Sequence, residues 1–124
     1  MPSKQVLSIG QCWADHGAIS GAFQLYFEAE VIAVDTAAEA LNLLKQKAFD
    51  LVLVNRLLDQ DGSPGLDFIR QLKEDGTLRQ LPVMLVSNHD DAQLEAGRAG
   101  AEPGFGKAAL GQPAMLGRVR RFVE

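Results

Sequence analysis

The chain has 124 residues, which suits one domain with a single hydrophobic core, and we expect residues 1–124 to form it. Hydrophobic residues make up 47% and charged residues 23%, as in ordinary globular proteins. The net charge of -4 argues against nucleic-acid binding, and no apolar stretch approaches the roughly 20 residues of a membrane span. The only cysteine, Cys12, excludes an intrachain disulfide and favours a reducing, cytoplasmic location.

Short apolar runs alternate with amphipathic stretches along the chain. The runs predict five strands, at residues 6–9, 31–34, 50–54, 83–86 and, more weakly, around Phe105. A helix should follow each strand: the first capped by Asp15, the second by Thr36 in a Thr-x-x-Glu capping box, and the third marked by apolar residues from Leu66 to Leu72 and ending near Gly76. The fourth should begin near Asp90 and the fifth at Pro113, which suits a first helical position.

This alternation predicts an α/β fold in which helices cover both faces of a parallel sheet. At this length the flavodoxin-like arrangement is the natural choice, with three α/β/α layers and strand order 2-1-3-4-5. In such a sheet, ligands bind outside the carboxyl ends of the strands. The residues expected at that edge after strands 1, 3, 4 and 5 are Gly10, Gln11, Asn55, Ser87, Asn88 and Lys107.

Several segments resemble the receiver domain of bacterial response regulators, the CheY-like modules of two-component phosphorelay signalling. They are residues 50–54 (DLVLV), 65–70 (GLDFIR), 81–87 (LPVMLVS), 100–101 (GA) and 105–107 (FGK). None of these segments is specific alone, but their order and spacing together span nearly the whole chain. The resemblance implies the same flavodoxin-like fold and a role in signal transduction rather than an enzyme.

The resemblance also implies a chemistry that this chain has lost. Receiver domains hold Mg²⁺ with an acidic pair after strand 1, and those positions fall on Gly10 and Gln11. They accept a phosphoryl group on an Asp after strand 3, and that position falls on Asn55. An amide is not a competent nucleophile at ambient pH, and Mg²⁺ binds through carboxylates and phosphate oxygens. We therefore expect no cofactor, with Mg²⁺ binding lost or weak, and no phosphorylation at Asn55.

Two family elements persist by resemblance and one does not. The hydroxyl that bonds a phosphoryl oxygen matches Ser87, and the cation matches Lys107. The aromatic switch residue matches Gly104, which has no side chain to change rotamer. These losses predict a pseudo-receiver that acts as a protein-interaction module. By resemblance, the expected partner is a histidine kinase, an output domain, or a second copy joined through the fourth and fifth helices.

Two alternatives remain open at this stage. Asp59 and Asp61 lie in an enlarged loop after the third strand, and either carboxylate could serve as a displaced acceptor or reach Lys107. The same composition is also typical of a solvated turn. The second alternative is a binder of a small anion at the carboxyl edge, with Ser87, Asn88 and Lys107 as polar contacts.

Four side chains have a plain structural interpretation beside the functional one. Asn55 can act through neutral hydrogen bonds, and Ser87 can cap the next helix. Lys107 has lost its expected acidic partners, so it should find another carboxylate or reach water. Trp13 can either cover the emptied pocket or anchor the first helix.

Overall fold

Five strands and five α-helices alternate in the computed structural model, which describes residues 4–124. The strands are β1 (Gln5–Ile9), β2 (Glu30–Val34), β3 (Leu51–Asn55), β4 (Val83–Val86) and β5 (Glu102–Phe105). The helices are α1 (Trp13–Phe27), α2 (Ala37–Gln46), α3 (Gly65–Glu74), α4 (Asp90–Arg98) and α5 (Pro113–Val123), and a short 3-10 helix, η1 (Lys107–Ala109), precedes α5. None of the helices within residues 4–124 has the length and apolar character that a membrane crossing requires.

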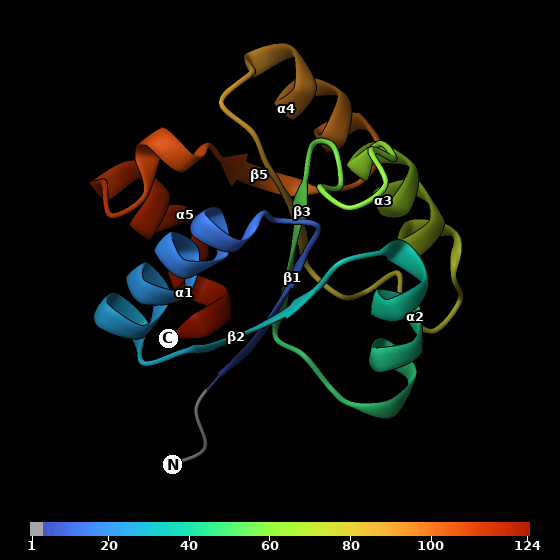
Figure 1. Ribbon diagram of the computed structural model, residues 1–124, viewed down its shortest axis with the longest axis horizontal. Helices are drawn as coiled ribbons and strands as arrows, with labels where there is room; N and C mark the ends of the chain where they lie inside the picture. The colour runs from blue at the N-terminus through green and yellow to red at the C-terminus, as the bar shows by residue number, and fades with distance from the viewer. Residues whose placement is uncertain (1–3) are drawn as a thin grey trace.

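The strands pair in parallel in the order β2-β1-β3-β4-β5. This confirms the flavodoxin-like α/β fold and the predicted strand order. Figure 1 shows the sheet between two helical layers, with α1 and α5 on one side and α2, α3 and α4 on the other. Because all strands run the same way, the carboxyl ends of β1, β3 and β4 meet at one edge, where the polar residues of the candidate site gather.

The central strand β3 shows why the apolar runs are continuous. Val52 and Val54 pack in the core cluster covered by α2, α3 and α4, whereas Leu51 and Leu53 pack in the cluster covered by α1 and α5. All four side chains are fully buried. A parallel strand with helices on both faces needs an apolar residue at every position, so it shows no polar alternation.

Most predicted helix starts are confirmed, but the first is not. Thr36 caps α2 as predicted, since its Oγ1 accepts a hydrogen bond from Glu39 N at 3.2 Å. Helix α1 begins at Trp13 after Cys12, so Asp15 lies inside the first turn and does not cap it. The start comes earlier than predicted because β1 ends at Ile9 and only a short loop follows it. This shift frees the Asp15 carboxylate for a tertiary contact.

Gly65, the first residue of α3, sits against the end of β3. Its N–H donates to the carbonyl oxygen of Arg56 at 2.8 Å. A Cβ atom built at Gly65 would lie 2.0 Å from the carbonyl oxygen of Asn55 and 2.8 Å from Val54 Cγ1. Because the nearest atom belongs to the backbone, no rotamer change can relieve that contact. A side chain at this position would push α3 away from the strand that carries Asn55.

We expect Gly65→Ala to lower the free energy of unfolding by about 1 to 3 kcal/mol, the usual cost of overpacking a tight contact. Gly76→Ala is the matched control, because a Cβ there meets nothing within 4 Å. It should leave stability unchanged or raise it by about 0.4 to 1 kcal/mol. Urea unfolding monitored by circular dichroism measures both. Equal stability of the two variants would contradict the close approach at Gly65.

Candidate functional site

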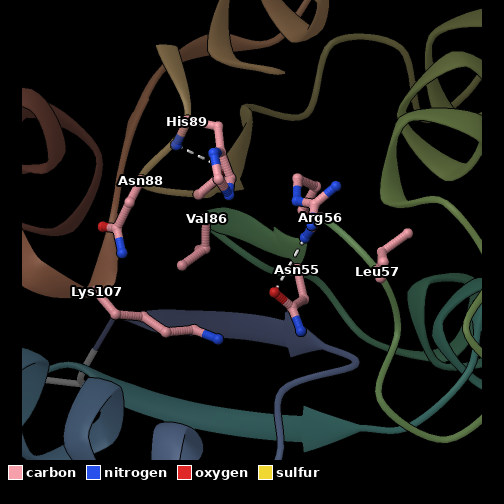
Figure 2. Close-up of a pocket in the computed structure, with 8 residues that line it drawn as sticks. Asn55, Arg56, Leu57, Val86, Asn88, His89 and Lys107 are labelled. Atoms are coloured by element: carbon pink, nitrogen blue, oxygen red, sulfur yellow. Dashed lines mark hydrogen bonds between the residues drawn. The ribbon is translucent and has the colours of Figure 1, made fainter. Parts of the chain in front are cut away.

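A polar cavity of about 270 Å³ opens at the carboxyl edge of the sheet. Figure 2 shows side chains from the ends of β3 and β4 and from the start of η1 converging on it, with Lys107 extending toward the end of β3. The lining residues are Asn55, Arg56, Leu57, Val86, Ser87, Asn88, His89 and Lys107. The cavity thus brings together four of the residues predicted from the sequence, whereas Gly10, Gln11, Gly104, Asp59 and Asp61 do not line it.

The Asn55 amide is hydrogen-bonded at both ends. Its Nδ2 donates to the carbonyl oxygen of Gly10 at 3.0 Å, and its Oδ1 accepts from Arg56 N at 3.0 Å (Figure 2 shows the second bond). The first bond joins the end of β3 to the loop after β1. An ionised carboxylate cannot donate a hydrogen bond, so Asp at this position would place negative charge against the Gly10 oxygen. The local geometry therefore suits an amide and not an acid.

Lys107 finds its carboxylate on α1. Its Nζ lies 2.6 Å from Asp15 Oδ2, and both side chains are about a third exposed. The Lys107 hydrogen bond, followed by one from the Cys12 thiol, holds the pKa of Asp15 below its usual value of 3.8. The prediction that Lys107 would find a carboxylate is confirmed. The suggestion of Asp59 or Asp61 as that partner is wrong, because the early start of α1 turns Asp15 toward η1.

Ser87 and Asn88 hold the loops around the cavity. The Oγ of Ser87 accepts a hydrogen bond from His89 N at 3.1 Å, just before the first residue of α4, so it organises the approach to the helix without capping its first turn. Asn88 Oδ1 accepts from Ala108 N at 3.2 Å and ties this loop to η1. Both polar side chains therefore accept hydrogen bonds from nearby backbone N–H groups.

Gly10 and Gln11, the residues predicted to replace the family's acidic pair, differ in their surroundings. Gly10 has φ of 75°, and a Cβ there would lie 2.4 Å from Leu58 Cδ2 and 2.8 Å from Leu58 Cα. Any side chain at Gly10 is thus both strained and obstructed. Gln11 is only 8% exposed, and its amide atoms have no hydrogen-bond partner within the described chain. Residues 4–124 contain no cluster of three or more His, Cys, Asp or Glu residues that could hold a metal.

The enlarged loop folds on itself. Asp61 Oδ1 accepts from Ser63 N at 2.9 Å and from Ser63 Oγ at 2.7 Å, and these two bonds lower the pKa of Asp61. Asp59 N donates to the carbonyl oxygen of Gly10 at 2.9 Å. These contacts are those of an Asx turn that packs against the β1 loop. They favour the solvated-turn interpretation of the two acidic residues.

Gly104, the residue predicted to match the family's switch aromatic, is hydrogen-bonded from both sides. Gln93 Oε1 of α4 accepts from Gly104 N at 3.2 Å, and Arg118 of α5 donates to the Gly104 carbonyl oxygen. The Gln93 amide also donates to the carbonyl oxygens of Leu85 at 2.9 Å and Ser87 at 3.1 Å. A Cβ at Gly104 would lie 2.2 Å from the Leu85 oxygen. Gln93 therefore occupies the space beside β5.

Sequence reasoning missed three residues and misplaced one. No local pattern marks Asp15, Gln93 or Arg118 as part of this region, because their partners lie far away in the chain. Trp13 neither covers the cavity nor anchors α1, since 91% of its surface is exposed. Both predictions for Trp13 are wrong, because the helix turns this residue outward, away from the face that carries the core.

Several solved structures have the same fold as this chain. A candidate response regulator of Chloroflexus aurantiacus J-10-fl is 16% identical, with a TM-score of 0.83 over 98% of each chain. The chemotaxis response regulator CheY4 of Vibrio cholerae is 16% identical, with a TM-score of 0.75 over 98% of this chain and 100% of its own. The phosphorylated cyanobacterial phytochrome response regulator RcpA is 20% identical, with a TM-score of 0.74 over 98% of this chain and 94% of its own. At these identities the likeness shows the fold alone.

No curated protein sequence matches the chain significantly. The sequence profile of the response regulator receiver domain, however, matches residues 14–108, which is well over half of the chain. The matched stretch runs from the first turn of α1 through β5 and Lys107, so it contains Asn55, Ser87 and the ion pair. The chain therefore belongs to the response regulator receiver domain family, whose members are the signalling modules of two-component systems.

Proposed function

We propose that this receiver domain works without phosphorylation, as a protein-interaction module in a two-component signalling protein. One observation carries the proposal. The residue at the acceptor position is an amide whose nitrogen and oxygen are both engaged, with Gly10 and Arg56. A phosphoryl acceptor needs an oxygen with a free lone pair that faces the incoming phosphorus. Asn55 supplies an amide oxygen, which is a weak nucleophile and is already accepting a hydrogen bond.

The charges of the site support the same conclusion. Phosphoryl transfer depends on neutralising negative charge on the entering phosphate. Lys107 is already neutralised by Asp15 at 2.6 Å, and Gly10 and Gln11 bring no carboxylate for Mg²⁺. An entering phosphate would have to displace a formed ion pair without help from a metal ion. Nucleophile, metal ligands and free cation are thus all missing from the positions where the family places them.

The surface formed by α4, β5 and α5 supports a domain with one fixed conformation. The family reports phosphorylation through an aromatic side chain near β5, and this chain has Gly104 there. The Gln93 amide bridges α4 to the ends of β4 and β5, and Arg118 joins α5 to the same glycine. These bonds hold α4, β5 and α5 in one arrangement. A partner that recognises this surface would find it in the same state at all times.

This surface also has the features of a docking site. A groove of about 500 Å³ lies between α4, β5 and α5. Leu94 of α4 lines it and is 58% exposed, and Pro103, Arg98 and Arg118 contribute apolar and basic character. Receiver domains interact with signalling proteins such as histidine kinases. We assign this groove to such a kinase or to an output domain. A second copy of the chain is the alternative occupant.

Phosphodonors should leave the protein unchanged. We expect acetyl phosphate or beryllofluoride with Mg²⁺ to produce no covalent adduct and no shift of amide resonances around the cavity, because the nucleophile and metal ligands are absent. Intact-mass spectrometry and amide NMR measure the two effects. A phosphoryl adduct that maps to Asp59 or Asp61 would overturn the proposal in favour of a displaced acceptor.

The Asp15–Lys107 pair should stabilise the fold in a pH-dependent way. The pKa of the Asp15 carboxyl is lowered in the folded state. Asp15 therefore contributes stability that is complete above its usual pKa of 3.8 and is lost as the pH falls through the lower pKa of the folded state. Asp15→Asn should therefore destabilise the protein at pH 7, by less than about 1 kcal/mol because the pair is partly exposed. The difference from wild type should shrink below pH 3.8. Thermal unfolding of both proteins at pH 7 and at a pH below 3.8 tests this. An equal difference in stability at the two pH values would refute it.

Replacing Asn55 by Asp should not restore a switch. Asn55→Asp removes the donor to the Gly10 oxygen and should cost about 1 to 3 kcal/mol of stability. Adding Gly10→Asp and Gln11→Asp is not a simple repair, because a Cβ at Gly10 collides with Leu58. The triple variant should be less stable than Asn55→Asp alone. Urea unfolding and phosphorylation by acetyl phosphate are the measurements. Ready phosphorylation of Asn55→Asp, with resonance shifts in α4, would show that the switch is intact.

A further inference from the structure

A second groove, of about 210 Å³, lies between α4 and the enlarged loop that follows β3. On α4 it is lined by Asp91, Ala92 and Glu95. It shares Arg56 and Leu57 with the polar cavity at the carboxyl edge of the sheet. None of these five residues lines the groove assigned above to a signalling partner. The second groove is therefore a separate feature of the molecule.

The enlarged loop gives this groove a preformed wall. Leu57 and Pro64 form an antiparallel bridge at the base of the loop, and both line the groove. Within the loop, Leu58 N donates to the carbonyl oxygen of Ser63 at 2.9 Å, and Gly62 N donates to the carbonyl oxygen of Leu58 at 2.7 Å. A wall that is already ordered reduces the entropy lost when a ligand binds.

The floor of the groove is apolar. Leu66 of α3, Leu85 of β4 and Ala92 of α4 line it together with Leu57. Leu85 is buried, whereas Leu57 is 45% exposed and follows the end of β3 (Figure 2). Helices α3 and α4 lie on the same side of the sheet (Figure 1). An apolar side chain placed on this floor would remove apolar surface from water, which is favourable.

Charged side chains of both signs border this apolar floor. Asp91 and Glu95 lie about one helical turn apart on α4, and Arg56 follows the end of β3. Within residues 4–124 none of the three forms an ion pair, because no opposite charge lies within 4.0 Å. Asp91 suits the positive end of the helix dipole, but Glu95 lies beyond the first turn and repels Asp91. The groove thus offers a cation and two carboxylates that the fold leaves unpaired.

We propose that this groove binds a free α-amino acid with an apolar side chain. The ligand carboxylate meets the Arg56 guanidinium, whose planar fork matches a carboxylate with two hydrogen bonds. The ligand ammonium meets Asp91 and Glu95, and the ligand side chain covers the exposed part of Leu57. The groove is smaller than the roughly 300 Å³ at which pockets for drug-sized ligands begin, so its size suits an amino acid.

The two signs of charge favour a free amino acid over other occupants. Inside a peptide both charges are replaced by amide groups, and a chain N-terminus brings the ammonium alone. An inorganic anion would add negative charge beside Asp91 and Glu95. A free amino acid uses the cation, the carboxylates and the apolar floor together. The site does not depend on the proposed function, and its failure would leave that function standing.

Leucine and two analogues test each contact on the full chain. N-Acetylleucine lacks the ammonium, and leucinamide lacks the carboxylate. In an NMR titration we expect leucine to give saturable shifts of the amide resonances of Leu57, Leu66 and residues 91–95. Each analogue should bind about tenfold more weakly, or weaker still. No saturable shift with leucine at tens of millimolar overturns the proposal. So does an analogue that binds as tightly as leucine, because one charged contact is then absent.

Two exposed charged residues give variants with matched controls. Arg56→Gln should weaken leucine binding about tenfold and leave the binding of leucinamide unchanged, because leucinamide has no carboxylate for Arg56. Glu95→Gln should weaken the binding of leucine and leucinamide but not that of N-acetylleucine. Arg70→Gln and Glu74→Gln on α3 make the same charge changes outside the groove and should leave leucine binding unchanged.

The controls separate a specific contact from a response to net charge. A control that weakens leucine binding as much as its matched groove variant overturns the proposal, because the charge of the whole chain then explains the effect. All four substituted residues are exposed, so each variant should fold like the wild type. Circular dichroism of each variant checks that expectation before the titrations are compared.

Discussion

The hydrogen bond from Asn55 Nδ2 to the Gly10 carbonyl oxygen fixes the carboxyl edge of the sheet, and the other features of the site depend on it. The Gly10 oxygen also receives Asp59 N, so one carbonyl joins the ends of β1 and β3 to the enlarged loop. Leu58 of that loop fills the space beside Gly10 and is fully buried. Amide, glycine and leucine are therefore mutually adapted. An acid at position 10 or 55 would disturb the other two residues.

The ion pair between Lys107 and Asp15 completes this reorganisation. A lysine left at the carboxyl edge without a carboxylate would be costly unless water reached it. Here a residue of α1 meets that charge at 2.6 Å and links the first helix to η1. The pocket that remains is lined by neutral and basic residues and by no carboxylate. The small-anion alternative rests on this lining and stays a prediction. Asp15 already neutralises Lys107, the cation that this alternative assigns to the anion.

Two surfaces lie away from this edge: one beside β5 and one on the outer side of α1. Near β5, Gln93 and Arg118 hydrogen-bond to the backbone of Gly104, where the resemblance predicts an aromatic side chain. On the opposite layer, α1 keeps an apolar outer face whose largest side chain is almost completely exposed. In the proposed function the domain does not change state, so a partner would meet the same α4–β5–α5 groove at all times.

The sequence alone determined the architecture, because buried parallel strands need continuous apolar runs and helices need recognisable starts such as Thr36 and Pro113. It also placed Gly10, Gln11 and Asn55 where the resemblance leads one to expect acids, since that expectation depends only on residue type. Tertiary structure decided the rest. Asp15 meets Lys107, Gln93 meets Gly104, and Leu58 blocks Gly10, and each pair joins residues that are distant in the chain. No local pattern encodes such pairs, because they exist only after the sheet has set which loops are neighbours.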